Sequence, residues 1–374
     1  MNTASLYIHI PFCAEFCDYC DFYSVNKSSH NEDYIDAFLN ALIKDIKYQI
    51  NCFSVKKIPT AYIGGGTPSI LGNKLQILFD ALKNIPAFKP VEFTIEANPE
   101  SITKEFLSMC KDGGVNRLSL GVQTFNEASR IAVNRAGKAD ILQERLALAS
   151  KFYNCSLSVD LITGLPFQTE KNILDDVAHI ITYKPVHLSL YSLTVESETK
   201  LAQNIKKNTV VLPDRDVSDS LWITGRDAII NAGYKQYEIS NFAINGKRCL
   251  HNLRYWQLQG WLGAGPSASG TIINEKAGVV KRFTYAKDVE AYIKNPAIQS
   301  AVCEDLDKLS FIKECLLMGF RCKDGPDPYL FIQRFGSAVE SFIPNTLKKW
   351  HGKDKMLFLN HFLHDVFTEL DSKK

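Results

Sequence analysis

Three cysteines close to the start of the chain have a spacing that suits metal chemistry. They are Cys13, Cys17 and Cys20, separated by three and then by two residues. Three thiolates so close together can bind three irons of a [4Fe–4S] cluster and leave the fourth iron without a protein ligand. A cluster with four cysteine ligands carries electrons, whereas an open iron can also bind a substrate or cofactor. The spacing therefore predicts an iron–sulfur site that takes part in chemistry.

Zinc and disulfides are the alternative uses of these thiols. A structural zinc site usually has four protein ligands, and no fourth cysteine or histidine stands at zinc-knuckle spacing. A disulfide framework is disfavoured because 10 cysteines in 374 residues is a low density and we expect no signal peptide. The other seven cysteines are scattered and are expected to be buried thiols, apart from Cys249, which lies two residues from His251.

The elements that must position the cysteines alternate between short β-branched or aromatic runs and longer amphipathic runs. The predicted strands are Leu6–Ile10, Ala61–Gly64, Val91–Ala97, Arg117–Val122, Leu157–Ile162 and Val186–Leu193. The predicted helices are Glu32–Ile50, Leu71–Ile85, Thr103–Asp112, Ala139–Phe152 and Glu170–Thr182, with a shorter one at Asn126–Val133. This alternation implies βα units around a parallel sheet, with catalytic groups at the C-terminal ends of the strands.

Further polar and glycine residues stand at those strand ends. The run Gly64-Gly65-Gly66-Thr67-Pro68 follows the second strand directly, and consecutive glycines let the backbone approach a ligand with its N–H groups exposed. Such a run is more often only a turn. Polar residues also end or follow the third, fourth and fifth strands: Glu96, Gln123, Arg135 and Asp160. Each alone can be a surface or capping residue, but together they mark one edge of the sheet.

Taken together, these motifs resemble the radical S-adenosylmethionine (SAM) superfamily, and within it the coproporphyrinogen dehydrogenase, or HemN-like, group. Tyr7–Cys13 reads as a strand that runs into the cluster loop, and Tyr19 precedes the third cysteine. The resemblance implies an α/β fold: a radical SAM partial (β/α)6 barrel with a small, mainly helical C-terminal domain of winged-helix type. It also implies that SAM binds the open iron and is cleaved by one electron to a 5′-deoxyadenosyl radical.

The resemblance also implies roles for individual residues. The glycine loop would contact the amino group of SAM, Glu96 its ribose hydroxyls, and Gln123, Arg135 and Asp160 the SAM pocket or the site beside it. The cofactor-binding set implied is Tyr7, Tyr19, Gly65, Gly66, Thr67, Glu96, Gln123, Arg135 and Asp160, and the metal ligands are Cys13, Cys17 and Cys20.

A later motif bears on whether the chain is a carrier or an enzyme. His251-Asn252-Leu253-Arg254-Tyr255-Trp256 resembles the signature of the HemW-type haem chaperones. A neutral imidazole is a good axial ligand for haem iron, and Tyr255 and Trp256 offer flat apolar surface to a porphyrin. The alternative is that His251 is a hydrogen-bonded structural residue and the aromatic pair is core. The first hypothesis is therefore a haem chaperone that delivers haem, as cargo, to haem-accepting respiratory proteins.

The second hypothesis is an oxygen-independent coproporphyrinogen III dehydrogenase. Those enzymes carry a further cysteine where this chain has Phe22, and an N-terminal extension that we expect to be absent here. Gly137 and Phe167 also depart from the relatives' pattern, in which a histidine and a glycine are common, and both changes lie near the substrate side. They leave open a third reading, a radical SAM enzyme with another substrate.

Composition and the remaining pattern complete the expectations. A formal net charge of +2 gives no case for nucleic-acid binding, and no apolar stretch is long enough for a transmembrane helix. We expect a cytoplasmic protein, a possible homodimer, with three parts: a barrel over 1–200, a linking segment over 201–300 and a helical domain over 301–374. The later elements expected are a helix at Asp214–Ala232, a strand at Tyr237–Asn241, a glycine-rich turn at Gly260–Gly270, and helices at Asp305–Met318, Pro328–Phe335 and Met356–Leu370.

Overall fold

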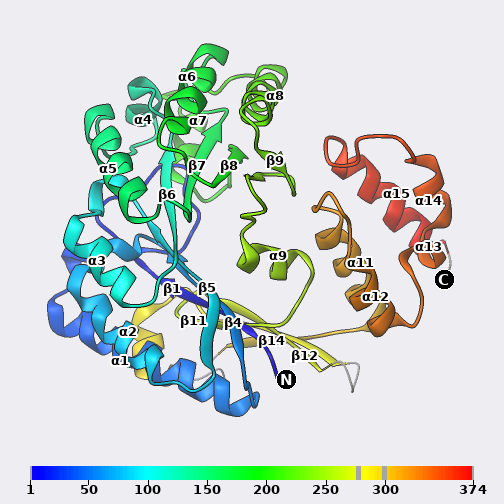
Figure 1. The fold of residues 1–374 in the computed structure, drawn as a ribbon, viewed down its shortest axis with the longest axis horizontal. Coiled ribbons are helices and arrows are strands. Elements are labelled where there is room, and N and C mark those ends of the chain that lie inside the picture. Colours follow the sequence, from blue (N-terminus) through cyan, green and yellow to red (C-terminus); the bar gives the residue numbers. More distant parts are fainter. Residues whose placement is uncertain (1, 275–278, 297–300, 373–374) are drawn as a thin grey trace.

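The computed structural model describes residues 2–274, 279–296 and 301–372, and its centre is a curved parallel sheet (Figure 1). Six parallel strands lie side by side in chain order: β1 Ser5–Ile10, β4 Ile58–Gly65, β5 Phe88–Ala97, β6 Arg117–Gln123, β7 Leu157–Thr163 and β8 His187–Ser192. Each coincides with a predicted strand to within a few residues. The predicted α/β partial barrel is confirmed.

Helices cover the outer face of these strands (Figure 1). They are α1 Glu32–Cys52, α2 Leu75–Lys83, α3 Lys104–Asp112, α4 Glu127–Ala132, α5 Ala139–Phe152, α6 Glu170–Ile181, α7 Lys200–Lys206 and α8 Arg215–Asn231. Several begin at a polar residue whose side chain accepts a hydrogen bond from the first turn: Asn31, Thr103, Asn126, Thr169, Thr199 and Asp214. Such caps satisfy N–H groups that a helix leaves unpaired, and so fix where each helix starts.

The strands alternate between apolar and polar residues, although parallel strands are often apolar throughout. In β1, Leu6, Ile8 and Ile10 are fully buried in the hydrophobic core shared with the helices. Ser5 and Tyr7, which alternate with them, point the other way and make polar contacts inside the barrel. Because successive strand residues face opposite sides, the same alternation along the neighbouring strands gives the barrel a polar interior, which we call the lumen.

The sheet continues beyond β1 in a way that the sequence did not predict. β11, Trp261–Ala264, pairs parallel with β1, and β12 Ser269–Asn274, β13 Val279–Thr284 and β14 Val302–Leu306 follow it antiparallel. The prediction of a turn over Gly260–Gly270 was therefore wrong for most of that range. A Cβ at Gly270 would lie 2.2 Å from the Phe283 ring, so this glycine permits close strand packing rather than a turn.

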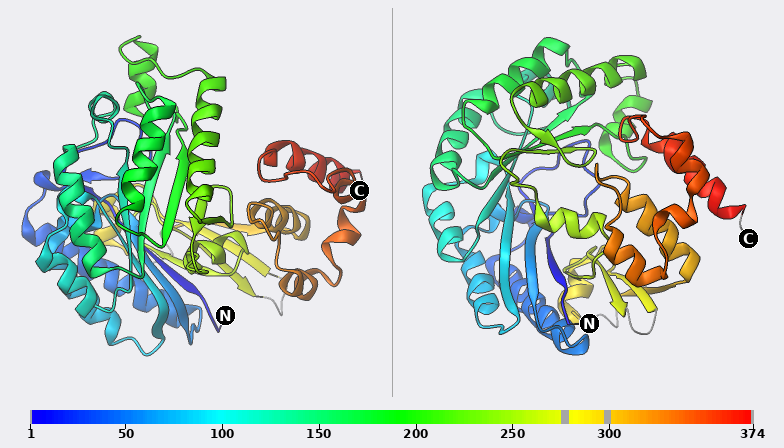
Figure 2. Two further views of the ribbon diagram at one scale, coloured as in Figure 1. Left: turned by 45° about the horizontal axis from the view of Figure 1, so that its top comes forward. Right: turned by 45° about the vertical axis from the view of Figure 1, so that its right-hand side comes forward.

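Short antiparallel strands extend the other edge of the sheet. β10, Asn241–Ala243, pairs with β8, and β9, Lys235–Gln236, pairs with β10. The strand predicted at Tyr237–Asn241 is therefore displaced, because the chain makes a tight connection between the two short strands. α9, Leu250–Trp256, was not predicted as an element at all. It lies between the inner side of the barrel strands and the C-terminal helices (Figure 2).

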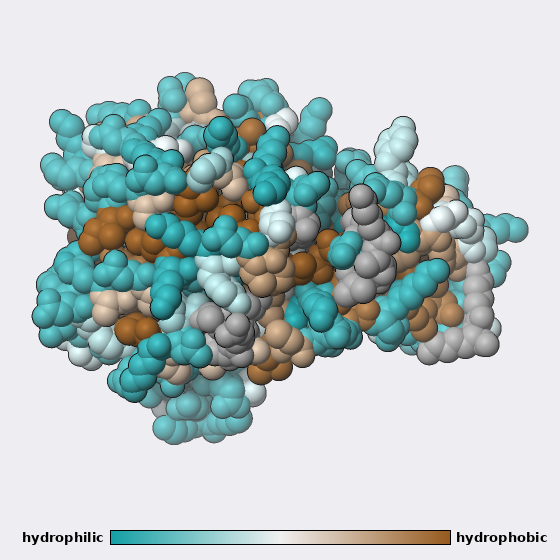
Figure 3. Space-filling view, turned by 90° about the horizontal axis from the view of Figure 1, so that it is seen from below, coloured by the Kyte–Doolittle hydropathy of each residue, from teal (hydrophilic) through white to brown (hydrophobic). Residues whose placement is uncertain are grey.

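The C-terminal helices form a lobe beside the barrel (Figures 2 and 3). They are α11 Lys308–Gly319, α12 Pro328–Phe335, α13 Val339–Phe342, α14 Pro344–Lys349 and α15 Leu359–Asp371, preceded by α10 Val289–Lys294. Their core includes Leu316 and Phe362 together with Ile273 and Val280 of the antiparallel strands. Within the described residues, no helix has both the length and the apolar character that crossing a membrane requires.

Candidate cofactor site at the carboxyl ends of the strands

The three predicted cluster ligands lie on the loop that leaves β1. The loop is held by two short parallel strands, β2 Phe12–Cys13 and β3 Val25–Asn26. Cys13 is buried, Cys17 is half-buried and Cys20 is exposed, and all three are free thiols. Among the described residues, no three His, Cys, Asp or Glu side chains converge as ligands of a single metal ion. The thiols are thus available on one loop, at the C-terminal end of the barrel.

A chain of polar contacts links the first two cysteines through other elements. The Cys13 Sγ lies 3.6 Å from Thr67 Oγ1, and Asn98 Nδ2 donates to that hydroxyl at 3.2 Å. The Arg135 guanidinium donates to Asn98 Oδ1 at 2.9 Å and to Cys17 Sγ at 3.4 Å. Burial raises the pKa of the Cys13 thiol, while the Thr67 hydroxyl and the Arg135 charge act in the opposite direction. The residues present therefore fit a cluster held by cysteines.

The glycine loop packs directly against the cluster loop. A Cβ at Gly66 would lie 2.7 Å from the Phe12 carbonyl oxygen and 3.1 Å from Cys13 Sγ. The Gly66 N–H donates to the Ile10 carbonyl, and the Thr67 N–H donates to that of Phe12. Any side chain at position 66 would push the two loops apart. The glycine-rich run is therefore required for close approach of backbone to the cysteine loop, and is more than a turn.

A pair of carboxylates lies in the lumen below this loop. Glu96 accepts from the Tyr62 hydroxyl at 2.6 Å and from the Gly65 N–H at 3.3 Å. Burial, opposed by the Tyr62 hydrogen bond and reinforced by the charge of Asp160, raises the pKa of Glu96 to about 7. Burial also raises the pKa of Asp160, although the Ser189 and Ser119 hydroxyls act in the opposite direction. A ligand with hydroxyl donors would stabilise either carboxylate in its charged form.

Unpaired polar atoms mark the space beside these groups. Gln123 Oε1 and Arg135 Nε are buried and have no hydrogen-bond partner among the described residues. Gln123 also has a φ of 70°, which is uncommon for a residue with a side chain, and it stands where the pairing of β6 with β7 shifts register. Buried groups without partners and local strain are typical of ligand sites. The donor set fits SAM, a polar ligand with charged and hydroxyl groups.

The two aromatic residues of the predicted set lie at different depths. The Tyr7 hydroxyl contacts His9 Nδ1 at 3.1 Å, inside the barrel and next to Tyr62. Tyr19 instead packs beside a small apolar cluster that includes Val133 and Leu201. The structure therefore brings Tyr7 close to the Glu96 group, and places Tyr19 on the loop between Cys17 and Cys20.

The predicted haem ligand lies at the opposite end of the barrel. His251 is fully buried on α9, with ring Nδ1 3.0 Å from Thr60 Oγ1 and Nε2 2.8 Å from the Tyr255 hydroxyl. Burial lowers the pKa of His251 to about 3, so the ring is neutral. Glu92 accepts from the N–H of His251 at 2.8 Å and so caps the helix. Thr60 and Glu92 stand early in β4 and β5, so α9 closes the N-terminal end of the lumen.

The rest of the α9 motif is packed in the same way. Tyr255 packs edge-on against Trp261 with ring centroids 4.8 Å apart, and the Arg321 guanidinium lies 4.5 Å from the Trp256 ring. Cys249 is buried, with its Sγ 3.6 Å from a Glu92 oxygen. In this conformation, iron ligation by His251 would require one of the two ring hydrogen bonds to be broken.

Comparison with known proteins agrees with this geometry. Residues 7–180 match the model of the radical SAM superfamily. The chain is 36% identical to a haem chaperone HemW of Escherichia coli over 98% of both chains. The chain belongs to the HemW-type family of radical SAM proteins. A second relative, the haem chaperone HemW of Bacillus subtilis, is 31% identical over 96% of this chain and 95% of its own.

A solved structure shares the fold over nearly the whole chain. Coproporphyrinogen III oxidase (HemN) from Escherichia coli superposes with a TM-score of 0.78, covering 98% of this chain and 90% of that one, at 21% identity. At that identity the likeness shows the fold, including the part beyond the barrel, and leaves the activity open.

Two site residues escaped the sequence analysis. Asn98 joins Thr67 to Arg135, and Tyr62 holds Glu96. A signal for both was present: Asn98 stands two residues after Glu96, and Tyr62 two before Gly64, so each shares the inward face of its strand.

Three residues depart from the relatives' pattern, and they lie on loops at the C-terminal end of the barrel. They are Phe22, Gly137 and Phe167. Phe22 and Phe167 are 63% and 68% exposed, so neither contributes to the core. Gly137 lies in the loop after α4, where its carbonyl accepts from Arg130 Nε at 2.9 Å.

Proposed function

We propose that this protein is a haem chaperone that binds a [4Fe–4S] cluster, SAM and haem, and passes haem to an acceptor protein. The observation that carries the proposal is that several proteins named haem chaperone HemW, from distant bacteria, align with nearly the whole of this chain. The intact donor set at the C-terminal end of the barrel supports it. Delivery to a haem-requiring respiratory protein, and a homodimeric state, are parts of the same proposal.

In this proposal the cluster is held by Cys13, Cys17 and Cys20, and it supplies one electron for SAM cleavage when it is bound. Thr67 contacts Cys13, Arg135 contacts Cys17, and Asn98 joins Thr67 to Arg135. Side chains that contact metal ligands usually set both the orientation of the ligands and the affinity of the site for its metal.

The residues of the lumen would hold SAM beside the cluster. The glycine loop would contact the amino group of SAM, and Glu96 would accept hydrogen bonds from the ribose hydroxyls. Gln123 and Arg135 offer the unpaired atoms described above. Asp160, held by Ser119 at 3.1 Å, completes the polar wall.

The test is a haem titration of the anaerobically reconstituted full chain, followed by its Soret absorbance. We expect saturable binding at about one haem per chain, and transfer of that haem to an acceptor apoprotein such as an apo-cytochrome. Binding that is weak and does not saturate would reject the chaperone function. SAM-dependent conversion of coproporphyrinogen III to protoporphyrinogen IX would also overturn it, in favour of the enzyme.

Two variants test the role of His251 in the motif. If α9 unpacks to let His251 bind iron, His251→Ala abolishes haem binding, and the Thr60→Val variant, which removes one of the hydrogen bonds of the ring, strengthens it. Thermal unfolding of both variants shows whether the base of the barrel remains folded.

A further inference from the structure

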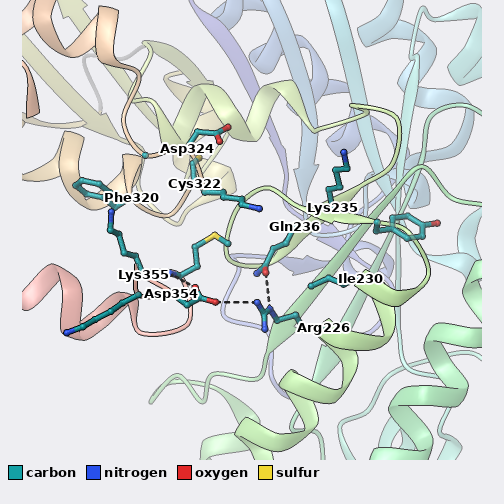
Figure 4. Close-up of a pocket in the computed structure, with 14 residues that line it drawn as sticks. Arg226, Ile230, Lys235, Gln236, Phe320, Cys322, Asp324, Asp354 and Lys355 are labelled. Atoms are coloured by element: carbon teal, nitrogen blue, oxygen red, sulfur yellow. Dashed lines mark hydrogen bonds and ion pairs between the residues drawn. The ribbon is translucent and has the colours of Figure 1, made fainter. Parts of the chain in front are cut away.

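A groove between the barrel and the C-terminal lobe is crossed by contacts that join the two parts. Figure 4 shows Arg226 of α8 between Gln236, to which its Nε donates at 3.0 Å, and Asp354 of the lobe, which lies 3.4 Å from its Nη2. Phe320, at the same groove, packs edge-on against Phe362 with ring centroids 4.7 Å apart. The lining of this groove therefore serves the junction of barrel and lobe.

Inside the barrel, an arginine that has no role in the proposed function lies beside the predicted SAM residues. Arg130, on α4, is 2% exposed. Arginine is rarely buried so fully unless its charge is paired and its five N–H donors have acceptors. Five oxygen atoms surround this guanidinium, four from backbone carbonyls and one from a carboxylate. The positions of these oxygens indicate what the arginine holds in place.

Two of the carbonyls lie on either side of Gln123. Arg130 Nη1 donates to the Val122 carbonyl at 2.8 Å and to the Thr124 carbonyl at 3.1 Å. Gln123 itself has a φ of 70°, in the left-handed region that residues with side chains seldom adopt. Two hydrogen bonds from one nitrogen therefore hold this strained residue, whose Oε1 is one of the unpaired atoms of the pocket.

The other two carbonyls belong to the residues that follow Arg135. Arg130 Nε donates to the Gly137 carbonyl at 2.9 Å, and Nη2 donates to that of Ala136. The Arg135 N–H donates in turn to the Arg130 carbonyl at 2.8 Å. Because the Arg135 side chain runs from this turn to Cys17 Sγ, the buried arginine fixes the backbone from which the cysteine contact is made.

A carboxylate from a third segment completes the arrangement. Glu100 Oε1 lies 2.9 Å from Arg130 Nη2. Burial and the charge of Arg135 lower the pKa of Arg130, and the charge of Glu100 acts in the opposite direction. Gly137 makes room for this carboxylate, because its φ is 89° and a Cβ there would overlap Glu100 Oε1. The histidine that is common at this position in the relatives would therefore displace the ion pair.

We propose that Arg130 is a positioning residue of the SAM pocket, which holds Gln123 and Arg135 in place through four neighbouring carbonyl groups. The inference rests on the proposed binding of SAM. Gly137 then serves the ion pair of Arg130 with Glu100, and its departure from the relatives' pattern does not reflect a different substrate.

The test measures the affinity of the anaerobically reconstituted full chain for SAM by equilibrium dialysis. Arg130→Met keeps the length of the apolar stem and removes all five donors, and Lys151→Met, at an exposed position of α5, is the control. We expect Arg130→Met to bind SAM about tenfold more weakly, and the control to bind as the wild type does. Glu100→Gln, which keeps an acceptor but removes the charge, is expected to weaken binding about threefold.

Two further readouts separate positioning from a general loss of structure. The first is the change that SAM causes in the electron paramagnetic resonance spectrum of the reduced cluster, which we expect to be smaller in Arg130→Met. The second is amide hydrogen exchange of the chain without cluster or SAM. We expect faster exchange in residues 122–138 of Arg130→Met, and wild-type exchange in the strands β1, β4 and β5.

The outcomes distinguish this proposal from the proposed function. If the wild type does not bind SAM, the proposed SAM site fails and the role of Arg130 fails with it. If the wild type binds SAM and a folded Arg130→Met protein keeps its Kd and its spectral response, the positioning role alone is overturned. Faster exchange throughout the barrel would also overturn it, in favour of a general structural role. If Arg130→Met does not fold, Glu100→Gln decides, since an unchanged Kd and unchanged exchange in residues 122–138 would reject the proposal.

Discussion

At the scale of single residues, the lumen holds a carboxylate in conditions that oppose its charge. Glu96 lies among Tyr62, Tyr7 and Asp160, and within the described part of the chain only the Tyr62 hydroxyl and one backbone N–H stabilise its anion. A carboxyl group buried in this way gains or loses its proton near neutral pH. Its protonation therefore links the stability of the ligand-free protein to pH.

The variant Glu96→Gln tests this link. Because the pKa of Glu96 is raised to about 7 in the folded state, the stability it contributes is present at acidic pH and is lost as the pH rises through 7. We expect Glu96→Gln to unfold at a higher temperature than the wild type at pH 8 without SAM, and the difference to shrink at pH 5. SAM affinity should fall about tenfold.

Glu127→Gln, on the exposed face of α4, is the control for that measurement. If Glu96→Gln followed the wild-type pH profile of thermal unfolding, the carboxylate would not be the group that titrates.

The variant Asn98→Ala tests the link between the cysteines. It removes the side chain that joins Thr67 to Arg135, while the contacts of these two residues with Cys13 and Cys17 remain. Loss of such an outer contact typically weakens metal affinity ~10–100-fold, so we expect the reconstituted variant to lose iron about tenfold faster to a chelator. Asn84→Ala, at an exposed helix end, should retain its cluster as the wild type does. Equal iron loss in both variants would contradict the role of Asn98.

At the scale of elements, one buried carboxylate joins α1 to segments at the far end of the sequence. Asp45 accepts from the Tyr285 and Tyr292 hydroxyls, each at 2.7 Å, and from Gln49 Nε2 at 3.0 Å. The Tyr292 hydroxyl in turn accepts from the Gly265 N–H. These contacts tie the first long helix to α10 and to the turn after β11.

Asp45→Ala therefore leaves several buried donors unpaired. We expect it to lower the free energy of unfolding by about 3 kcal/mol, as measured by urea denaturation followed by circular dichroism. Lys47→Ala, on the exposed side of the same helix, should change it by less than about 0.5 kcal/mol. A loss of similar size in the two variants would show that Asp45 has no special part in joining the elements.

At the scale of the whole molecule, the barrel could be predicted and its extension could not. The six strands and their helices follow from the alternation of short β-branched or aromatic runs with longer amphipathic runs. Glu96 and Gln123 lie at strand ends as predicted, whereas Asp160 lies in the middle of β7. β11 and β12 were missed because Gly263, Gly265 and Gly270 resemble a turn. Their glycines serve close packing with Ser269, His9 and Phe283, which only the tertiary structure shows.

The α9 motif illustrates the same limit in the site. Its resemblance to the HemW signature predicts that His251 is a haem ligand, and that role stays a prediction. Pattern alone cannot tell which ring nitrogens are already bonded, and here Thr60, from a strand 191 residues away, occupies one of them. Asn98 was missed for a similar reason, since its partners come from two other loops.

The pairing of β1 with β11 has a consequence for how the chain acquires its structure. The strand that leads to the cysteine loop has partners on both sides, β4 some 55 residues later and β11 some 256 residues later. Contacts between such distant segments form slowly. While the ribosome is still adding residues before Trp261, one side of β1 has no neighbour. We expect pulsed hydrogen exchange to show the amides of β4 and β5 protected first during refolding, and those shared by β1 and β11 last. The cysteine loop would then complete its surroundings only after the residues of β11 have been added.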